Sequence, residues 1–276
     1  MEIKNQIPAW LDESHPNFVR WKHARDLSIE RGKFVFSIVT RKVQKKKLSV
    51  LDLGSGEGGT AKVFSEDNFV VSLDLSLARL KRQSENSFDF QRVNGSALIL
   101  PFANHSFDLI IIQDVIEHLA GTNDFYFEVK RVLKSNGNIY LSTPNKFSMF
   151  NFISDPHFGL PVISILKRET IKKYVLKYFR KNDFDRNDIA QLFSLSELIN
   201  LFKNDFNISL QTKYSVQEIF NGNNGIVWSD FHLKLIALCK FLKLDWLLNK
   251  IANDEFGVLN KYFAPTFYVT LKKLSP

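Results

Sequence analysis

The sequence predicts an α/β protein with a doubly wound, mostly parallel sheet. Short, nearly continuous apolar runs alternate with helical segments between about residues 47 and 145, as is typical of parallel strands buried on both faces. A glycine-rich loop follows the first of these runs. Because ligands of such sheets bind beyond the carboxyl ends of the strands, where the strand order reverses, we expect the ligand site there.

The predicted elements follow one another regularly along the chain. A helix of mixed amphipathic character is expected first, over residues 17–45. The expected strands cover residues 48–53, 69–74, 88–93 (the weakest), 107–113, 137–143, 206–212 and 265–271. The expected helices cover residues 57–66, 76–85, 114–119, 123–134 and 195–204, with Ser76 capping the second and Ser194 or Ser196 the last.

The length of 276 residues fits one large domain that carries insertions. The polar turn at 221–225 is the clearest internal break. We expect six segments: an N-terminal helical segment (1–46), the ligand-binding α/β core (47–145), a lid insertion (146–193), a core helix and strand (194–216), a second helical insertion (217–262) and the terminal strand of the core (263–276).

Composition describes a globular protein with a substantial core. Hydrophobic residues make up 45% of the chain and charged residues 24%, which is ordinary for a folded domain. The single cysteine, Cys239, cannot form an intramolecular disulfide. The first residues lack the pattern of a signal peptide, and no run approaches the roughly 20 apolar residues that span a bilayer. We therefore expect a cytoplasmic protein.

The net charge of +8 is concentrated in two clusters. One cluster spans residues 41–47, directly before the first strand, and so at the end of the sheet away from the ligand. The other runs from Lys167 to Lys181 within the lid insertion. The second cluster could hold a phosphate or an anionic membrane surface, or it could simply be a solvated face. The segment from Phe231 to Leu248 is mainly apolar, with lysines at intervals. This pattern suits either an interfacial helix or a helix of the core or lid.

The glycine loop fits two kinds of nucleotide ligand. Gly54, Gly56 and Gly59 satisfy the dinucleotide pattern, and Asp74 ends the second strand, where its carboxylate can accept both ribose hydroxyls of an adenosine. Both features suit NAD and S-adenosylmethionine equally. Asp52 stands directly before the glycines. A carboxylate there repels a pyrophosphate but suits a ligand with an ammonium and a sulfonium group, which favours S-adenosylmethionine.

In addition, Leu100-Pro101-Phe102 and Ser106-Phe107-Asp108 precede Glu117-His118-Leu119. With these motifs in this order, the sequence resembles the class I S-adenosylmethionine-dependent methyltransferases, and within them the ubiquinone-pathway O-methyltransferases. The resemblance is strong over residues 47–145. It implies a seven-stranded, Rossmann-like methyltransferase fold whose last strand is inserted antiparallel, with the helical insertions forming a lid.

The expected cofactor site combines the loop with the ends of neighbouring strands. Its members are Asp52, Gly54, Ser55, Gly56, Gly58, Asp74, Leu75, Ser96, Ala97 and Gln113. The family often has an Asp for the adenine amino group where this chain has Ser96. A serine hydroxyl makes a weaker hydrogen bond than a carboxylate, so the Ala97 amide and packing against Leu75 or Leu98 would share the task.

Two histidines are candidate general bases. His118 follows the strand at 107–113, close to the expected methyl group, although a structural role explains it equally well. His157 lies in a proline-flanked loop of the lid insertion, where Asp155 could orient its imidazole. Methyl transfer needs no metal, and no cluster at metal-ligand spacing is visible in the sequence.

The expected acceptor is a hydroxyl on a small molecule, a glycan or a lipid-linked intermediate. The segment from Thr143 to Pro161 has a weaker resemblance to bacterial methyltransferases that act on surface-glycan or lipid-linked precursors. Alternatives are an RNA methyltransferase, suggested only by the net charge, a NAD-dependent dehydrogenase, and a non-catalytic S-adenosylmethionine-binding protein. No RNA-binding module is visible, so nucleic acid is not expected as a partner. The oligomeric state cannot be predicted.

Overall fold

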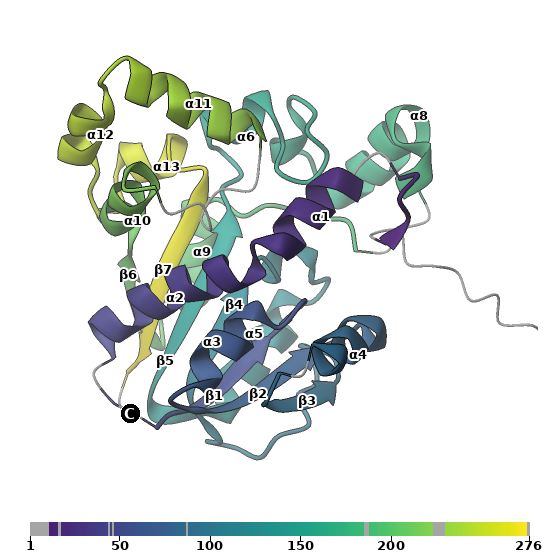
Figure 1. The fold of residues 1–276 in the computed structure, drawn as a ribbon, viewed down its shortest axis with the longest axis vertical. Helices are drawn as coiled ribbons and strands as arrows, with labels where there is room; N and C mark the ends of the chain where they lie inside the picture. The colour runs from purple at the N-terminus through teal and green to yellow at the C-terminus, as the bar shows by residue number, and fades with distance from the viewer. Residues whose placement is uncertain are drawn as a thin grey trace, which may run out of the picture.

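A seven-stranded sheet forms the centre of the molecule (Figure 1). The computed structural model describes residues 11–15, 18–43, 45, 47–86, 88–184, 188–222 and 230–274. The start of the N-terminal segment, Lys46 and the end of the polar turn at 221–225 therefore lie outside the described residues. The strands are β1 (Ser49–Leu53), β2 (Phe69–Asp74), β3 (Gln91–Asn94), β4 (Phe107–Gln113), β5 (Leu133–Pro144), β6 (Phe206–Leu210) and β7 (Thr266–Lys273).

The strand order confirms the predicted doubly wound fold. It runs β3-β2-β1-β4-β5-β7-β6. The pairs from β3 to β5 are parallel, whereas β7 is antiparallel to both of its neighbours. The order reverses between β1 and β4, because the chain winds outward from β1 in one direction and from β4 in the other. Ligands of open α/β sheets bind at this switch point.

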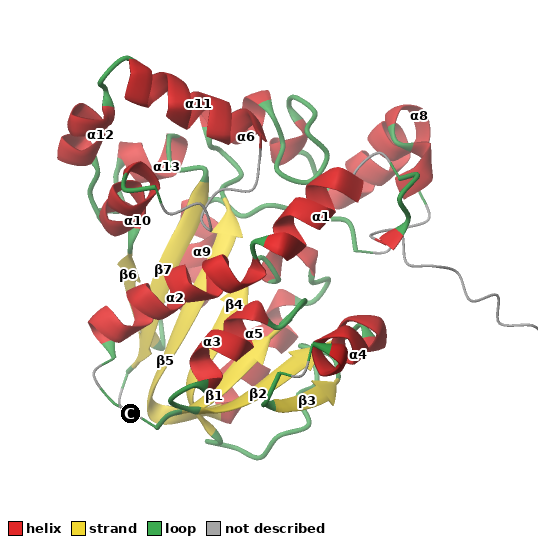
Figure 2. Cartoon of the chain, in the orientation of Figure 1, coloured by secondary structure: helices red, strands yellow, loops and turns green. Residues whose placement is uncertain are grey.

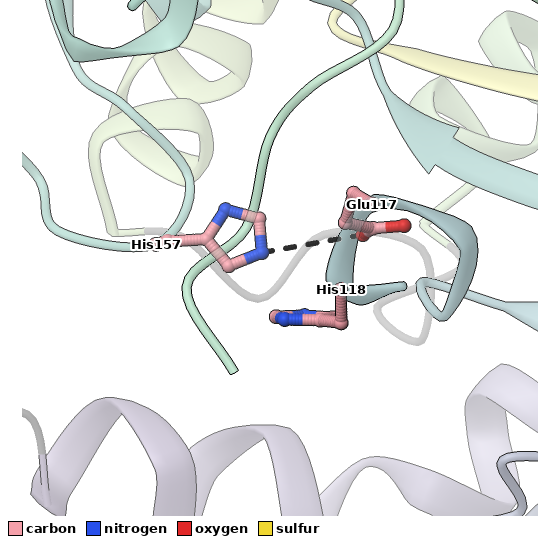
Figure 3. Close-up of side chains that lie close together, drawn as sticks. All are labelled: Glu117, His118 and His157. Carbon is pink, nitrogen blue, oxygen red and sulfur yellow. Dashed lines mark ion pairs between the residues drawn. The ribbon is translucent and has the colours of Figure 1, made fainter. Parts of the chain in front are cut away.

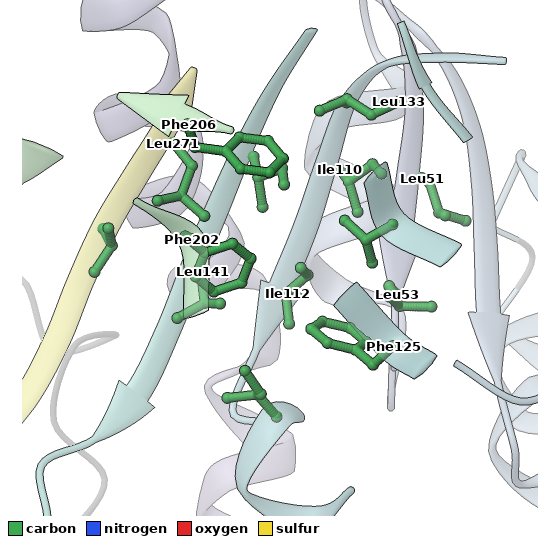
Figure 4. Close-up of a cluster of buried hydrophobic side chains, with 14 of the residues drawn as sticks. Leu51, Leu53, Ile110, Ile112, Phe125, Leu133, Leu141, Phe202, Phe206 and Leu271 are labelled. Carbon is green, nitrogen blue, oxygen red and sulfur yellow. The ribbon is translucent and has the colours of Figure 1, made fainter. Parts of the chain in front are cut away.

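Helices cover both faces of the sheet, as Figure 2 shows. They include α1 (Phe18–Asp26), α2 (Ser28–Lys42), α3 (Gly59–Ser65), α4 (Leu77–Glu85), α5 (Thr122–Val132) and α9 (Leu195–Phe202). One face packs buried side chains of α2 and α3 against β1, β2 and β4. The other face packs α5 and α9 against the sheet, with Phe125, Phe202 and Phe206 among its aromatic members (Figure 4).

Most predicted elements form, and two differ in an instructive way. The helix predicted over 17–45 is interrupted at Leu27, which separates α1 from α2. The prediction of a helix over 114–119 is wrong, because only a short 3-10 turn, η2 (Ile116–His118), forms there. Asp114 has a φ of 52°, and this left-handed conformation turns the chain sharply away from a helical course. The serine caps at Ser76 and Ser194 form as predicted.

The insertions lie at the end of the molecule toward which the parallel strands point (Figure 1). The lid insertion contains α6 (Met149–Ile153), η3 (Ile163–Ile165), α7 (Arg168–Thr170), a π-helical stretch η4 (Ile171–Leu176), α8 (Lys177–Phe179) and η5 (Lys181–Asp183). The later helices are α10 (Thr212–Phe220), α11 (Asp230–Phe241), α12 (Asp245–Ile251) and α13 (Val258–Tyr262). Within the described ranges, every helix is too short or too polar to cross a bilayer.

Candidate active site

The glycine loop leaves β1 at the switch point and passes between the end of β2 and Val115, which follows β4. Gly54 and Gly56 have φ values of 72° and 54°, which side chains rarely tolerate. The main-chain N–H groups of Gly54 and Ser55 both donate to the carbonyl of Leu73. A Cβ on Gly54 would lie 2.4 Å from the Val115 side chain. The loop therefore needs glycine for its backbone conformation at both positions and for space at Gly54.

Asp74 is held at the end of β2 by the backbone around it. One carboxylate oxygen accepts from the Gly56 N–H at 2.9 Å, and the other accepts from the Ser76 N–H at 2.8 Å. The Arg79 guanidinium lies 3.8 Å away. The Ser76 hydroxyl itself caps α4, so the helix does not need Asp74 as its cap. The carboxylate is fixed beside the glycine loop, where the remaining lone pairs can accept ribose hydroxyls.

Gln83 of α4 supports the glycine loop through its side-chain amide, a role that no local sequence pattern indicates. Its side-chain amide donates to the Gly56 carbonyl at 2.7 Å and to the Ser55 hydroxyl at 3.0 Å. Its own carbonyl accepts from the Ser72 hydroxyl at 2.8 Å. Gly58, predicted to bind cofactor, faces this glutamine, because a Cβ there would lie 2.9 Å from the Gln83 side chain. Gly58 thus makes room for this side chain.

Asp52 is almost completely buried behind the loop. One carboxylate oxygen accepts from the Ala61 N–H in the first turn of α3 at 3.1 Å. Burial raises the pKa of this carboxyl to about 7, because the charged form loses its hydration. A cation bound nearby would favour the ionised form and so lower that pKa.

The predicted adenine-binding residues flank the ends of β2 and β3. Leu75 is 77% exposed although it directly follows the buried Asp74, so its side chain is available to a flat apolar ligand. The Ser96 hydroxyl accepts from the Leu98 N–H at 3.2 Å. Ser96 thus stabilises the turn as an acceptor, and its hydroxyl can still donate one hydrogen bond to a ligand. Ala97 packs at the edge of the large core cluster.

The end of β4 is tied to α3 and α2. The Gln113 amide donates to the Thr60 hydroxyl in α3. Asp114 pairs with Arg31 of α2, with 2.5 Å between the guanidinium nitrogen and the carboxylate oxygen. Arg31 was not predicted as a site residue, since it lies 83 positions away in sequence. The ion pair brings α2 over the switch point.

A glutamate and two histidines meet above the end of β4 (Figure 3). Glu117 is fully buried, and its Oε1 lies 4.0 Å from the Nε2 of His157. Its other oxygen accepts from the Thr143 hydroxyl at 3.0 Å. Burial, with Asp114 nearby, raises the pKa of Glu117 well above its ordinary value. The two imidazole rings meet edge to face, with centroids 5.1 Å apart.

This cluster could not be read from sequence spacing, because its members come from two segments 39 positions apart. Each of the three side chains offers a ligand-type atom, and these atoms lie within 4.8 Å of one another. The sequence displayed no such grouping, and the fold assembles one. The Glu117-His118 motif was the one sequence feature that pointed to this cluster. It suggested His118 as a base and gave no indication that the buried Glu117 would take part.

The lid insertion is fastened to the turn that carries Glu117 and His118. His118 Nδ1 lies 2.7 Å from the Asp188 carbonyl; because a carbonyl only accepts, Nδ1 carries the proton and Nε2 is the basic atom. The Arg168 guanidinium donates to the carbonyls of Glu117 and Leu119. Asp155 accepts from the main-chain N–H groups of His157 and the next residue. Asp155 therefore shapes the loop that presents His157.

The site as a whole fits a nucleoside with a cationic tail. Asp74 lies beside the glycine loop, Leu75 is exposed next to it, and Asp52 stands behind the loop where a pyrophosphate would be repelled. Gly56 adds open space, since a Cβ there would find its nearest neighbour 3.9 Å away. The predicted cofactor residues are thus gathered along one edge of the sheet, and the two histidines lie beyond it. S-adenosylmethionine matches this arrangement.

Comparison with known proteins agrees with this arrangement. Residues 51–141 match the family model described as a methyltransferase domain. The chain is 30% identical to the uncharacterized protein MJ0638 of Methanocaldococcus jannaschii, over 54% of this chain and 63% of that one. It is 25% identical to the ubiquinone biosynthesis O-methyltransferase of Bartonella quintana, over 56% of this chain and 59% of that one. The chain thus spans about three fifths of the length of these relatives.

A solved structure resembles almost the whole fold. It is a SAM-dependent methyltransferase of Thermotoga maritima, described as a possible histamine N-methyltransferase, with a TM-score of 0.52 and 13% identity. The alignment covers 94% of this chain and 95% of that one. At this identity the likeness concerns the fold alone. Fold, site and family model together define an S-adenosylmethionine-binding α/β protein. The family match places a methyltransferase domain at residues 51–141 of this chain.

Proposed function

We propose that this protein transfers the methyl group of S-adenosylmethionine to a hydroxyl oxygen of its acceptor. The observation that carries the proposal is the pairing of His157 with the buried Glu117 across 4.0 Å, beyond the end of β4. An alcohol must lose its proton as its oxygen attacks the methyl carbon, so a positioned base is useful. An amine that is already neutral needs no such group.

His157 takes the proton in this scheme. The positive charge that develops on its imidazole favours the ionised form of Glu117 and so lowers the pKa that burial raises. The bond from the acceptor oxygen to the methyl carbon forms as the carbon–sulfur bond breaks, and its electron pair stays on sulfur. S-adenosylmethionine supplies the activated methyl group when it is bound. The protein binds the adenosine through Asp74, aligns the acceptor, and excludes water with the lid insertion.

The acceptor belongs to a small molecule, a glycan or a lipid-linked intermediate. The relative from Bartonella quintana is named as an O-methyltransferase, which supports oxygen as the acceptor atom. The Thermotoga maritima structure carries an N-methyltransferase description, so an amine is the competing acceptor. The test below includes both kinds of acceptor.

The cofactor assignment predicts which ligands bind. In titration calorimetry, S-adenosylmethionine and S-adenosylhomocysteine should bind, and NAD should not. Asp74→Ala should weaken S-adenosylmethionine binding at least roughly 100-fold, because two charge-assisted hydrogen bonds to the ribose are lost, each with a net contribution of about 1.5–3 kcal/mol. Tight binding of NAD alone would overturn the assignment.

The base assignment predicts unequal effects of the two histidines. Transfer from tritiated-methyl S-adenosylmethionine is measured with a catechol, a simple glycoside and a primary amine as acceptors. His157→Ala should lower transfer to hydroxyl acceptors by roughly 10²–10⁴-fold, while cofactor binding stays unchanged. His118→Ala is the matched control and should cost less. Full turnover by His157→Ala, or transfer to the amine only, would contradict the proposal.

A further inference from the structure

The helical stretch from Arg168 to Phe179, made of α7, η4 and α8, has two contrasting sides. Its inner side buries Ile171, Val175 and Leu176 in a small cluster of the lid insertion. Its outer side carries three lysines and three aromatic residues, all exposed, which we call the lysine–aromatic face: Lys172, Lys173, Tyr174, Lys177, Tyr178 and Phe179. The helix is therefore already packed on one side, and the opposite side meets solvent.

The arginines and lysines of this region lie on different sides of the stretch. The two arginines turn inward: Arg168 donates to carbonyls of the core, and Arg180 donates to the carbonyl of Phe158. The lysines remain outward, and Lys167 and Lys181 at the two ends are exposed as well. Glu169 is the acidic residue of the stretch. The outer side thus presents five lysines against one carboxylate, a charge that complements an anionic surface.

Aromatic rings stand exposed beside these lysines. Phe179 is 74% exposed and Tyr178 62% exposed, and the ammonium of Lys177 lies 5.5 Å from the centroid of the Tyr178 ring. In the same insertion, Phe152 and Ile153 of α6 are also exposed. Aromatic rings with lysines suit the boundary between headgroups and acyl chains. Exposed isoleucine and phenylalanine side chains favour this boundary over RNA as the partner, because the phosphate backbone of RNA offers no apolar surface to them.

We propose that the lysine–aromatic face docks on an anionic lipid bilayer. The lysines are drawn to the anionic headgroups, each raising the affinity about fivefold when it lies near the surface, and the rings enter the interface. This inference goes beyond methyl transfer and does not depend on it. The partner is a bilayer surface, and RNA is the competing occupant that the experiment must separate from it.

The position of the face gives the docking a direction. The stretch lies at the end of the molecule where the parallel strands point, as do α6 and α11 (Figure 1). The described basic residues before β1, which are Arg41, Lys42, Lys45 and Lys47, lie at the opposite end, next to the start of that strand. Binding through the lysine–aromatic face therefore turns the candidate active site toward the membrane and leaves the other cluster in solution.

The experiment measures sedimentation of the full chain with vesicles, without cofactor. Vesicles of phosphatidylglycerol mixed with phosphatidylcholine should bind the protein, and vesicles of phosphatidylcholine alone should bind it weakly. The triple variant K172E/K173E/K177E should lower the affinity at least roughly 100-fold. The control K42E/K203E/K272E changes the net charge equally at exposed positions near the other end, and it should retain binding.

Phe179→Ser tests the ring without altering charge and should weaken binding at least about fourfold, because the apolar ring no longer enters the interface. Circular dichroism confirms that each variant is folded. The proposal is overturned if both triple variants lose binding equally, which would indicate only net charge. It is also overturned if the wild-type chain ignores anionic vesicles, or if a mobility-shift assay finds that the lysine–aromatic face binds RNA instead. Loss of methyl transfer in any variant leaves this result unaffected.

Discussion

At the scale of single residues, three buried carboxylates at the switch point are set to different tasks by their surroundings. Asp74 is fixed by two backbone N–H groups, whereas Asp52 and Glu117 have pKa values raised by burial. The sequence could indicate Asp52 and Asp74, because each stands at a fixed place relative to the glycines. It could not indicate Glu117 as a partner of His157, since only the fold brings the lid insertion to that turn.

The raised pKa of Asp52 predicts that cofactor affinity depends on pH. Below pH 7 the carboxyl is largely protonated in the free protein, and a cationic ligand must displace that proton. The affinity for S-adenosylmethionine should therefore rise by up to about tenfold per pH unit as the pH approaches 7, and level off above it. Calorimetry across this range measures the profile.

Asp52→Asn provides the control for this pH profile. It removes the titrating group while keeping an oxygen that can accept from the Ala61 N–H. Its affinity should be lower at pH 8 and nearly flat below pH 7. If the wild-type protein and Asp52→Asn show the same pH dependence, the cofactor does not sense Asp52.

At the scale of elements, the strands were the most predictable part and the packing of α2 was the least. Strands such as β2 and β4 form at their predicted residues, because uninterrupted apolar runs between glycine or polar turns leave few alternatives. The place of α2 depends on close backbone contact instead. Gly32 and Gly59 lie where α2 meets α3, and a Cβ on either would approach the backbone of the other segment within 2.8 Å. Such complementarity has no local sequence pattern.

Gly59→Ala should therefore destabilise the fold despite the better helix propensity of alanine. A Cβ at Gly59 would lie 2.3 Å from the carbonyl carbon of Ser28, so α2 must shift. The free energy of unfolding should fall by about 2 kcal/mol, measured by urea denaturation. Gly257→Ala is the matched control, because its Cβ would meet nothing within 4 Å, and its stability should change little. Equal stability of the two variants would show that α2 and α3 are not tightly packed.

At the scale of the whole molecule, the candidate site and the basic cluster before β1 lie at opposite ends. The doubly wound order and the antiparallel β7 were predictable from motif order, since the glycine loop and Asp74 belong to a known arrangement. The shape of the insertions was not, because short helices such as α6 and α8 have weak periodic signals and depend on tertiary packing. Their end of the molecule carries the candidate site, and the other end carries the cluster that precedes β1.

Arg168 ties the lid insertion to the core, which limits how the insertion can be exchanged in an engineered protein. One guanidinium serves carbonyls of Glu117, Leu119 and Ile189, and the Gln191 N–H also donates to the Glu117 carbonyl. A chimera in which residues 146–193 were exchanged for a short linker would leave these carbonyls of the turn without their donors. The insertion is thus no detachable module: grafting a different one onto this core requires a donor that replaces Arg168.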